Sequence, residues 1–202
     1  MSDPPEPSDT ASKVLDVAER LVQGRGFNGF SYADAAAELG ITKAALHYHF
    51  AGKAELGEAL ITRYAERFAR ALDAIDARTD DAMDKLRAYA ALYGDVLRNE
   101  RMCLCGMLAA EYQTLPAPMQ GAVVRFFDDN EAWLAGVLED GRRAGAVRSD
   151  GDARDAARMI VGALEGAMLV SRLHADPARF SEAADRLLAS LAAPGPATLG
   201  EH

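Results

Sequence analysis

The stretch from Phe30 to Phe50 constrains the fold most, because it predicts two short helices joined by a tight turn. Ser31 can cap the first helix, since its hydroxyl can accept a hydrogen bond from an unpaired N–H of the first turn. Asp34 follows three residues later, as in a capping box. Gly40 tolerates the left-handed conformation that ends a helix, and Thr42 can cap a second helix directly after it. This order predicts a helix-turn-helix.

The second of these helices has the chemistry of a DNA-recognition helix. It carries hydrogen-bond donors and cations, and residues 40–53 contain no acid. Such side chains bond phosphate oxygens and base edges when a helix enters the major groove. The alternative is an ordinary helical hairpin with a polar outer face.

The segment FSYADAAAELGITKAALHYHFAGKAEL (residues 30–56) resembles the DNA-binding signature of the tetracycline-repressor (TetR) family of bacterial regulators. The family pattern is a Ser/Thr-capped helix, a Gly-Val/Ile-Ser/Thr turn, a Leu-Tyr-x-His/Tyr-Phe helix and a Lys that opens the next long helix. Here the turn is 40–42, the recognition helix ends at residues 46–50, and Lys53 takes the lysine place. His47 departs from the usual Tyr, which generally contacts a phosphate, and imidazole would make that contact depend on pH.

The resemblance covers about a quarter of the chain, from about Ala11 to Leu60, and it implies a homodimeric, ligand-responsive repressor. Each subunit would place residues 42–49 in one major groove of a palindromic operator in double-stranded DNA. A small-molecule effector would then favour a dimer whose recognition helices are wrongly spaced for consecutive grooves. The residues expected to contact bases, backbone or phosphates are Ser31, Thr42, Lys43, Ala44, Ala45, His47, Tyr48, His49 and Lys53.

Composition weighs against nucleic-acid binding, because the formal net charge of the 202 residues is −9. The acids are spread over the whole chain, however, whereas the recognition segment is locally cationic. No apolar run is long enough to span a membrane, and the first residues lack the pattern of a signal peptide. We therefore expect a soluble, cytoplasmic protein.

Hydrophobic periodicity beyond the first unit predicts helices and no strand, hence an all-α fold. The expected domains are a disordered tail (1–9), a three-helix DNA-binding domain (10–53), a helical ligand-binding and dimerisation domain (54–193) and a second disordered tail (194–202). Helix 53–77 is the covalent link between the two domains, so its rotation would re-aim the recognition helix. The other expected helices cover about residues 10–24, 81–99, 104–114, 119–144, 152–174 and 177–193.

The helix expected at 152–174 is apolar on more than one side, so it has to be covered on several sides. Gly162, Ala163, Gly166 and Ala167 would let another helix approach closely. The last two helices from each of two subunits would make a four-helix interface about a two-fold axis. Members of the TetR family usually dimerise in this way.

In TetR relatives the helices that correspond to about 54–174 enclose a small-molecule pocket. Such pockets are mostly apolar, with a few placed polar groups. Plain core packing is the alternative for each aromatic residue, and the ligand is not readable from these residues. The candidate lining is Tyr89, Tyr93, Met107, Glu111, Tyr112, Phe126, Phe127, Asn130, Trp133 and Met168.

Cys103 and Cys105 are the two cysteines, too few for a disulfide framework. A closed metal site needs four ligands, so we expect no metal, and we expect no cofactor either. The segment RMCLCGMLAAE resembles a subset of TetR-like regulators in which some members respond to electrophiles or oxidants through a Cys. A thiol near a helix N-terminus with Arg101 nearby would be more acidic than usual, while inert buried thiols remain the alternative.

Two other classes of function stay open. An all-α enzyme would need a nucleophile–base set, metal-ligand spacing or a Gly-rich phosphate loop, and none is visible. A helical dimer that acts through protein partners is compatible with His47 and with the acidic charge.

Overall fold

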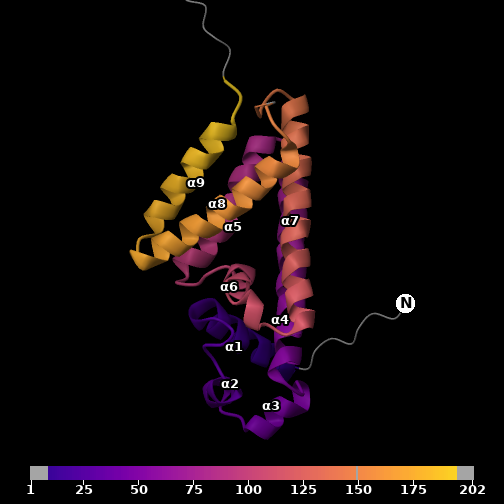
Figure 1. Ribbon diagram of the computed structural model, residues 1–202, viewed down its shortest axis with the longest axis vertical. Helices are drawn as coiled ribbons and strands as arrows, with labels where there is room; N and C mark the ends of the chain where they lie inside the picture. The colour runs from indigo at the N-terminus through magenta and orange to yellow at the C-terminus, as the bar shows by residue number, and fades with distance from the viewer. Residues whose placement is uncertain (1–8, 149, 195–202) are drawn as a thin grey trace, which may run out of the picture. The chain divides into compact units, whose positions relative to one another are not determined.

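The computed structural model describes residues 9–148 and 150–194, and in this part of the chain it is built from helices, with a single isolated bridge between Val147 and Ala192 (Figure 1). The all-α prediction is confirmed. The predicted tails lie almost wholly outside the described residues, but Asp9 already belongs to the first helix. The helices are α1 (Asp9–Arg25), α2 (Tyr32–Leu39), α3 (Lys43–His49), α4 (Lys53–Arg78), α5 (Ala82–Arg98), α6 (Leu104–Ala110), the 3-10 helix η1 (Tyr112–Thr114), α7 (Ala117–Arg143), α8 (Ala153–Leu173) and α9 (Pro177–Leu191).

Contacts divide the chain into two compact units. The first comprises residues 1–68 and 100–126, and the second comprises residues 69–99 and 127–202. Helices α4 and α7 therefore run through both units, and α6 belongs to the same unit as α1, α2 and α3. The functional boundary expected after residue 53 stays a prediction.

Local capping forms α2 and α3 as predicted. Ser31 accepts a hydrogen bond from the N–H of Asp34, whose carboxylate accepts one from the N–H of Ser31 in return, which completes a capping box. Gly40 ends α2 in the left-handed region, at φ 66°, where glycine is favoured. Thr42 caps α3 by accepting from the N–H of Ala45 at 3.1 Å.

The core of the first unit forms from the apolar stripe of α1 and the aromatic residues around α2. Phe27, in the loop between α1 and α2, is buried. Gly57 in α4 lets α7 approach, because a Cβ there would lie 2.5 Å from Met119 Sδ and 2.9 Å from Phe27 Cε2. The buried side chains of the stripe and its neighbours are Val14, Leu15, Ala18, Leu21, Val22, Phe30, Leu46 and Phe50.

Two helix ends differ from the prediction. The helix expected over residues 104–114 stops at Ala110 and continues as the 3-10 turn η1 before Pro116. Helix α7 begins at Ala117 instead of Met119 and includes Pro118 in its first turn, where the missing N–H has no intrahelical partner to lose.

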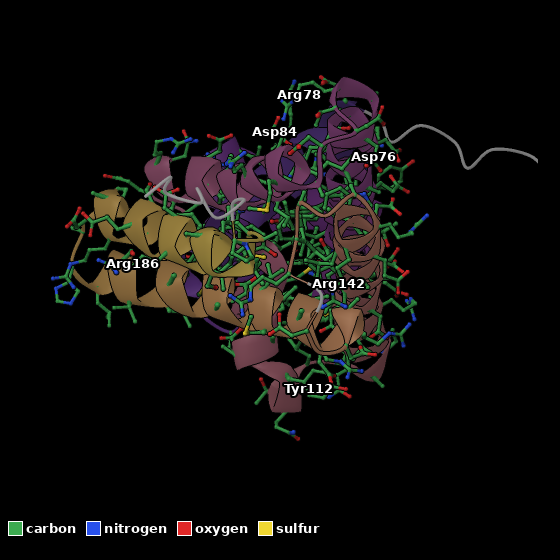
Figure 2. All side chains as sticks on the ribbon, turned by 90° about the horizontal axis from the view of Figure 1, so that it is seen from above. Asp76, Arg78, Asp84, Tyr112, Arg142 and Arg186 are labelled. Atoms are coloured by element: carbon green, nitrogen blue, oxygen red, sulfur yellow. The ribbon has the colours of Figure 1, made fainter. Side chains whose placement is uncertain are left out.

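In the second unit α8 and α9 lie side by side, and both pack on α5 (Figure 1). Arg142 closes the loop after α7, because its guanidinium donates to the carbonyl oxygens of Arg148, Asp150 and Gly151 at 3.0–3.2 Å (Figure 2). In the part of the chain that the structure describes, no helix is long and apolar enough to cross a membrane.

Candidate nucleic-acid interface

Helix α3 turns one face into the core and the other to solvent. Leu46 is fully buried, and Phe50, the residue that ends the helix, is also buried. The opposite face exposes Lys43, His47 and Tyr48, and the Tyr48 side chain is 87% exposed. A large aromatic residue with this exposure gains nothing from the core, so it is available to a partner.

Tyr32 of α2 braces the end of α3. Its hydroxyl donates to the carbonyl oxygen of Phe50 at 3.1 Å, and its ring lies 4.7 Å from that of His47. Burial, helped by the negative charge of Glu55, raises the pKa of Tyr32 to about 12. The phenol is protonated at physiological pH and can donate this bond, a role that was not predicted from the sequence.

His47 has a partner inside the protein. Its Nδ1 lies 3.2 Å from the carbonyl oxygen of Ala51. A carbonyl oxygen only accepts, so the ring can bond Ala51 only through a protonated Nδ1. The phosphate contact expected of His47 stays a prediction.

Lys53 makes its contacts inside the first unit. Its Nζ donates to the carbonyl oxygens of Phe27 and Phe30 and lies 4.5 and 4.4 Å from the centres of their rings. Burial lowers the pKa of Lys53, although the negative charges of Glu111 and Asp34 oppose this. Two of its three donors are therefore occupied, and the geometry favours a structural role over the phosphate contact that was expected.

The remaining DNA-binding candidates also divide into residues that have partners inside the unit and residues whose side chains are exposed. Lys43 and Ala44 are exposed on the outer face, and Ala45 and His49 are half-buried. The Ser31 hydroxyl donates to Asp34 at 2.7 Å, and this bond with the backbone bond from Ser31 lowers the pKa of Asp34. Ser31 and Thr42 therefore serve the helix starts first, while Lys43 and Tyr48 present their side chains outward.

Sequence reasoning missed the ion pairs that join α1 to α4. Glu19 is buried, and its carboxylate accepts from Arg63 at 3.2 Å and from Arg67 at 2.5 and 3.1 Å. Arg63 also pairs with Asp16 at 2.8 Å. These contacts fix α1 to the middle of α4, and only their spacing of three or four residues on each helix could have indicated them.

Four of the predicted ligand-binding residues come together in the second unit. The hydroxyls of Tyr89 and Tyr93 lie 3.1 Å apart, and Tyr89 donates to Oδ1 of Asn130 at 3.3 Å. The ring of Trp133 stacks on that of Tyr89 at 5.7 Å, and its Nε1 donates to Asp76 at 2.9 Å. Met168, on α8 of the same unit, is fully buried, and Phe127 is half-buried.

The other candidates belong to the first unit. Phe126 packs against Tyr64 and Phe68, with ring centres 5.6 and 5.3 Å away, and Met107 is half-buried. Tyr112 lies in η1, where its carbonyl oxygen accepts from Gln120 at 2.9 Å.

Glu111 departs furthest from expectation. Its carboxylate accepts from the backbone N–H groups of Phe27 and Asn28 in the loop between α1 and α2. This geometry does not support the expectation that Glu111 is a polar group of a ligand pocket.

Comparison with known proteins gives the chain a family. The family model "Bacterial regulatory proteins, tetR family" matches residues 14–60, and the model "Tetracyclin repressor-like, C-terminal domain" matches residues 82–187, more than half of the chain. The protein belongs to the TetR family. It is therefore a DNA-binding transcriptional regulator of helix-turn-helix type, and the family is not one of enzymes.

Two relatives found by sequence and one crystal structure each match more than four fifths of this TetR-family chain. The regulator LmrA of Bacillus subtilis is 27% identical over 171 residues, which are 81% of this chain and 86% of LmrA. The repressor BepR of Brucella suis is 25% identical over 178 residues, 85% of this chain and 84% of BepR. The crystal structure of a TetR-family regulator from Agrobacterium tumefaciens is 30% identical, with a TM-score of 0.89, and covers 93% of this chain and 100% of that one.

The cysteines of this TetR-family protein are both buried. Cys103 caps α6, where its Sγ accepts from the N–H of Gly106 at 3.4 Å, and the hydroxyl of Tyr64 donates to the same sulfur at 3.7 Å. Among the described residues no group of three or more His, Cys, Asp or Glu side chains is placed to hold a metal.

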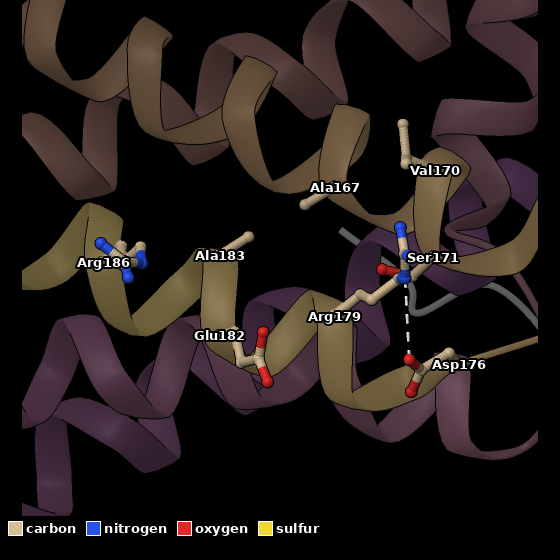
Figure 3. Close-up of a pocket in the computed structure, with 8 residues that line it drawn as sticks. All are labelled: Ala167, Val170, Ser171, Asp176, Arg179, Glu182, Ala183 and Arg186. Atoms are coloured by element: carbon tan, nitrogen blue, oxygen red, sulfur yellow. Dashed lines mark ion pairs between the residues drawn. The ribbon is translucent and has the colours of Figure 1, made fainter. Parts of the chain in front are cut away.

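Between α8 and α9 lies a hollow of about 530 Å³, and none of its lining residues is among the predicted ligand-binding residues (Figure 3). Arg179 and Asp176, an ion pair at 3.7 Å, lie on one side of it. Its other lining residues are Ala167, Val170, Ser171, Glu182, Ala183 and Arg186.

Proposed function

We propose that this TetR-family regulator is a homodimeric repressor that binds a palindromic operator through α3 and leaves it when an effector binds. The observation that carries the proposal is the outer face of α3, where Lys43, His47 and Tyr48 are exposed on a helix whose other face is buried. The N-terminus of α3 carries no acid and is capped by Thr42, so its free N–H groups add to the attraction for phosphate.

Pairing through α8 and α9 is supported by the apolar surface that α8 leaves uncovered. Met159, Leu169 and Val170 are half exposed, and Leu173 is 83% exposed. Gly162 and Ala163 lie exposed among them, as close helix packing requires. A contiguous apolar strip of this kind marks an association surface, and a second copy of the same strip would cover it.

An effector site in the second unit is supported by the cluster of Tyr89, Tyr93, Asn130 and Trp133. Such a cluster offers stacking surfaces and polar groups that a flat or partly polar molecule could take over. Cys103 provides a second route for a signal, because alkylation or oxidation of its Sγ would remove the acceptor that caps α6 and bonds Tyr64.

Selection of duplexes from a random pool by the purified protein tests the proposal. The expected product is a palindrome whose half-sites are separated by about one turn of DNA or a multiple of it. The protein with both Lys43→Ala and Tyr48→Ala serves as the control and should enrich nothing. A wild-type protein that enriches no palindrome would contradict the proposal, and regulation in the cell that survives both substitutions would favour action through protein partners.

A further inference from the structure

The loop between α1 and α2 (residues 26–31) is held on two sides by opposite charges. On one side the carboxylate of Glu111 accepts from backbone N–H groups, and on the other the ammonium of Lys53 donates to backbone carbonyl oxygens. Phe27 takes part in both, since its N–H donates to Glu111 and its carbonyl oxygen accepts from Lys53. Neither charged residue belongs to the loop, and Glu111 is 84 residues away from Phe27 in the sequence.

The contacts of Glu111 are specific. Its Oε2 lies 2.6 Å from the N of Phe27 and 3.2 Å from the N of Asn28, and its Oε1 lies 3.3 Å from the latter. The side chain of Asn28 donates to Oγ1 of Thr114 at 2.7 Å, and this hydroxyl donates to the carbonyl oxygen of Glu111 at 2.8 Å. The loop is therefore attached to the end of α6 and to η1 through both backbone and side chain.

Gly26 provides an independent observation at the same place. Its φ is 81°, in the left-handed region, and a Cβ at this position would lie 2.7 Å from Oε1 of Glu111. Any side chain at residue 26 would push the carboxylate away. The glycine is therefore required both for the bend of the loop and for the approach of Glu111.

A second link joins the segment before α6 to the end of α1. The N–H of Met102 donates to the carbonyl oxygen of Gln23 at 3.3 Å. The segment that contains α6 thus contacts the end of α1 at its start and the following loop at its end. A displacement of α6, whose first turn depends on the Sγ of Cys103, would pull on the loop directly.

We infer that Glu111 is a positioning residue for DNA binding, whose carboxylate holds loop 26–31 and thereby sets the orientation of α2 and α3 on α1. This inference rests on the proposed function. It adds a direct connection between α6 and the DNA-binding helices, separate from rotation of α4. Loss of the carboxylate releases the N–H groups of Phe27 and Asn28, so the loop samples more conformations and α3 is less well placed for a groove.

The first test is spectroscopic and needs no DNA. The backbone amide proton shifts of Phe27 and Asn28 should differ between the wild-type protein and the Glu111→Gln variant, since an ionised acceptor makes a stronger bond. In the Glu111→Gln variant, which keeps one acceptor oxygen, both shifts should move toward those of weaker hydrogen bonds. In Glu111→Ala the exchange of both amide hydrogens should become about tenfold faster or more.

The second test measures affinity for the duplex that the wild-type protein selects from the random pool. Glu111→Ala should weaken binding about tenfold and Glu111→Gln by less, because the amide side chain restores an acceptor. Gln113→Ala, in η1 two residues after Glu111, and Glu66→Ala, an exposed acid of the same unit, are the matched controls and should bind as the wild type does. Circular dichroism and the melting temperature establish that each variant is folded.

The outcomes separate the inference from the function on which it rests. Amide shifts that ignore the Gln substitution, or wild-type affinity in a folded Glu111→Ala variant whose amides exchange faster, would overturn the positioning role. A wild-type protein that selects no duplex removes the proposed function and the effect on DNA binding with it. In that case the amide proton shifts and exchange rates of Phe27 and Asn28 still decide whether Glu111 holds the loop.

Discussion

Two surfaces of this regulator are equally open to solvent and opposite in chemistry. The outer face of α3 carries Lys43, His47 and Tyr48, whereas the outer face of α8 carries Met159, Leu169 and Leu173. Tyr48 and Leu173 have nearly the same exposure, 87% and 83%. Equal exposure therefore has a different free-energy cost for each face, because water solvates the polar face of α3 well and the apolar face of α8 poorly.

The difference indicates what each surface binds. A face of cations and hydrogen-bond donors suits a hydrated, negatively charged partner, while an apolar strip interrupted by glycine and alanine suits another apolar helix. The net charge of −9 is that of the whole chain, and residues 40–53 contribute no acid to it. The protein can thus be acidic overall and still offer one local surface to DNA, provided that self-association doubles that surface.

The largest effect is expected when the apolar face is made charged. The double substitution Leu169→Asp and Leu173→Asp places two carboxylates where two subunits are proposed to meet, so sedimentation should show a monomer. Because two linked sites bind far more tightly than one, affinity for the selected duplex should fall about a thousandfold.

The matched control for that change is Ala132→Asp, an exposed position on α7. It adds one carboxylate outside α8, half the charge of the double substitution, and should leave both the dimer and the affinity unchanged. A double variant that still sediments as a dimer would show that the subunits do not meet through this apolar face of α8.

Two substitutions in α3 separate its buried face from its exposed one. Leu46→Ala removes a fully buried side chain and should lower the free energy of unfolding by about 3 kcal/mol. Tyr48→Ala should change it by less than about 0.5 kcal/mol but weaken DNA binding about tenfold. Urea denaturation and a binding titration give the two quantities, and a Tyr48 variant that loses stability instead would show that its ring serves the fold.

A smaller effect is expected for Lys43→Ala. The ammonium group is expected to neutralise one phosphate, so its loss should weaken binding several-fold and by a similar factor on every duplex. The plot of log affinity against log salt concentration should become less steep by about one. An unchanged salt slope would mean that Lys43 reads a base edge or contacts no DNA, and Lys13→Ala, an exposed lysine of α1, is the control.

The structural features that depend on residues close together in the sequence could be predicted. Ser31, Gly40 and Thr42 reveal the ends of α2 and α3 because capping uses residues only three or four positions apart. The uncovered face of α8 was also visible, since a helix that is apolar nearly all round needs more cover than one chain supplies. The resemblance to the TetR family added the function.

Contacts between distant residues could not be predicted in this way. Gly26 is visible in the sequence only as a helix breaker, and nothing local shows that Glu111 approaches it. Lys53 matched a family position, but its two carbonyl partners emerge only once Phe27 and Phe30 are folded against α4. Aromatic spacing likewise suggested Tyr89 and Trp133 separately, without showing that they stack.

The smallest effect is expected for Tyr32. Its substitution tests how much the hydrogen bond from its hydroxyl to Phe50 stabilises the end of α3. Burial first and the charge of Glu55 second raise its pKa from 10.0 to about 12 in the folded protein. Between these values the unfolded chain loses the phenolic proton and the folded one keeps it, so the Tyr32 contribution is complete below pH 10 and is lost as the pH rises toward 12. At about pH 8, Tyr32→Phe should lower the free energy of unfolding by about 1 kcal/mol, through the lost bond to Phe50.

Comparing the wild type with Tyr32→Phe at each pH cancels the other groups that titrate in alkali. The difference in their free energies of unfolding, measured with urea, should narrow above about pH 10, because ionisation favours only the unfolded wild type. Ultraviolet absorbance of the phenolate should show one tyrosine that ionises later than the rest and is missing from the variant. A stability difference that stays constant with pH would mean that the Tyr32 hydroxyl is solvated instead of bonded to Phe50, and that the recognition helix lacks this brace.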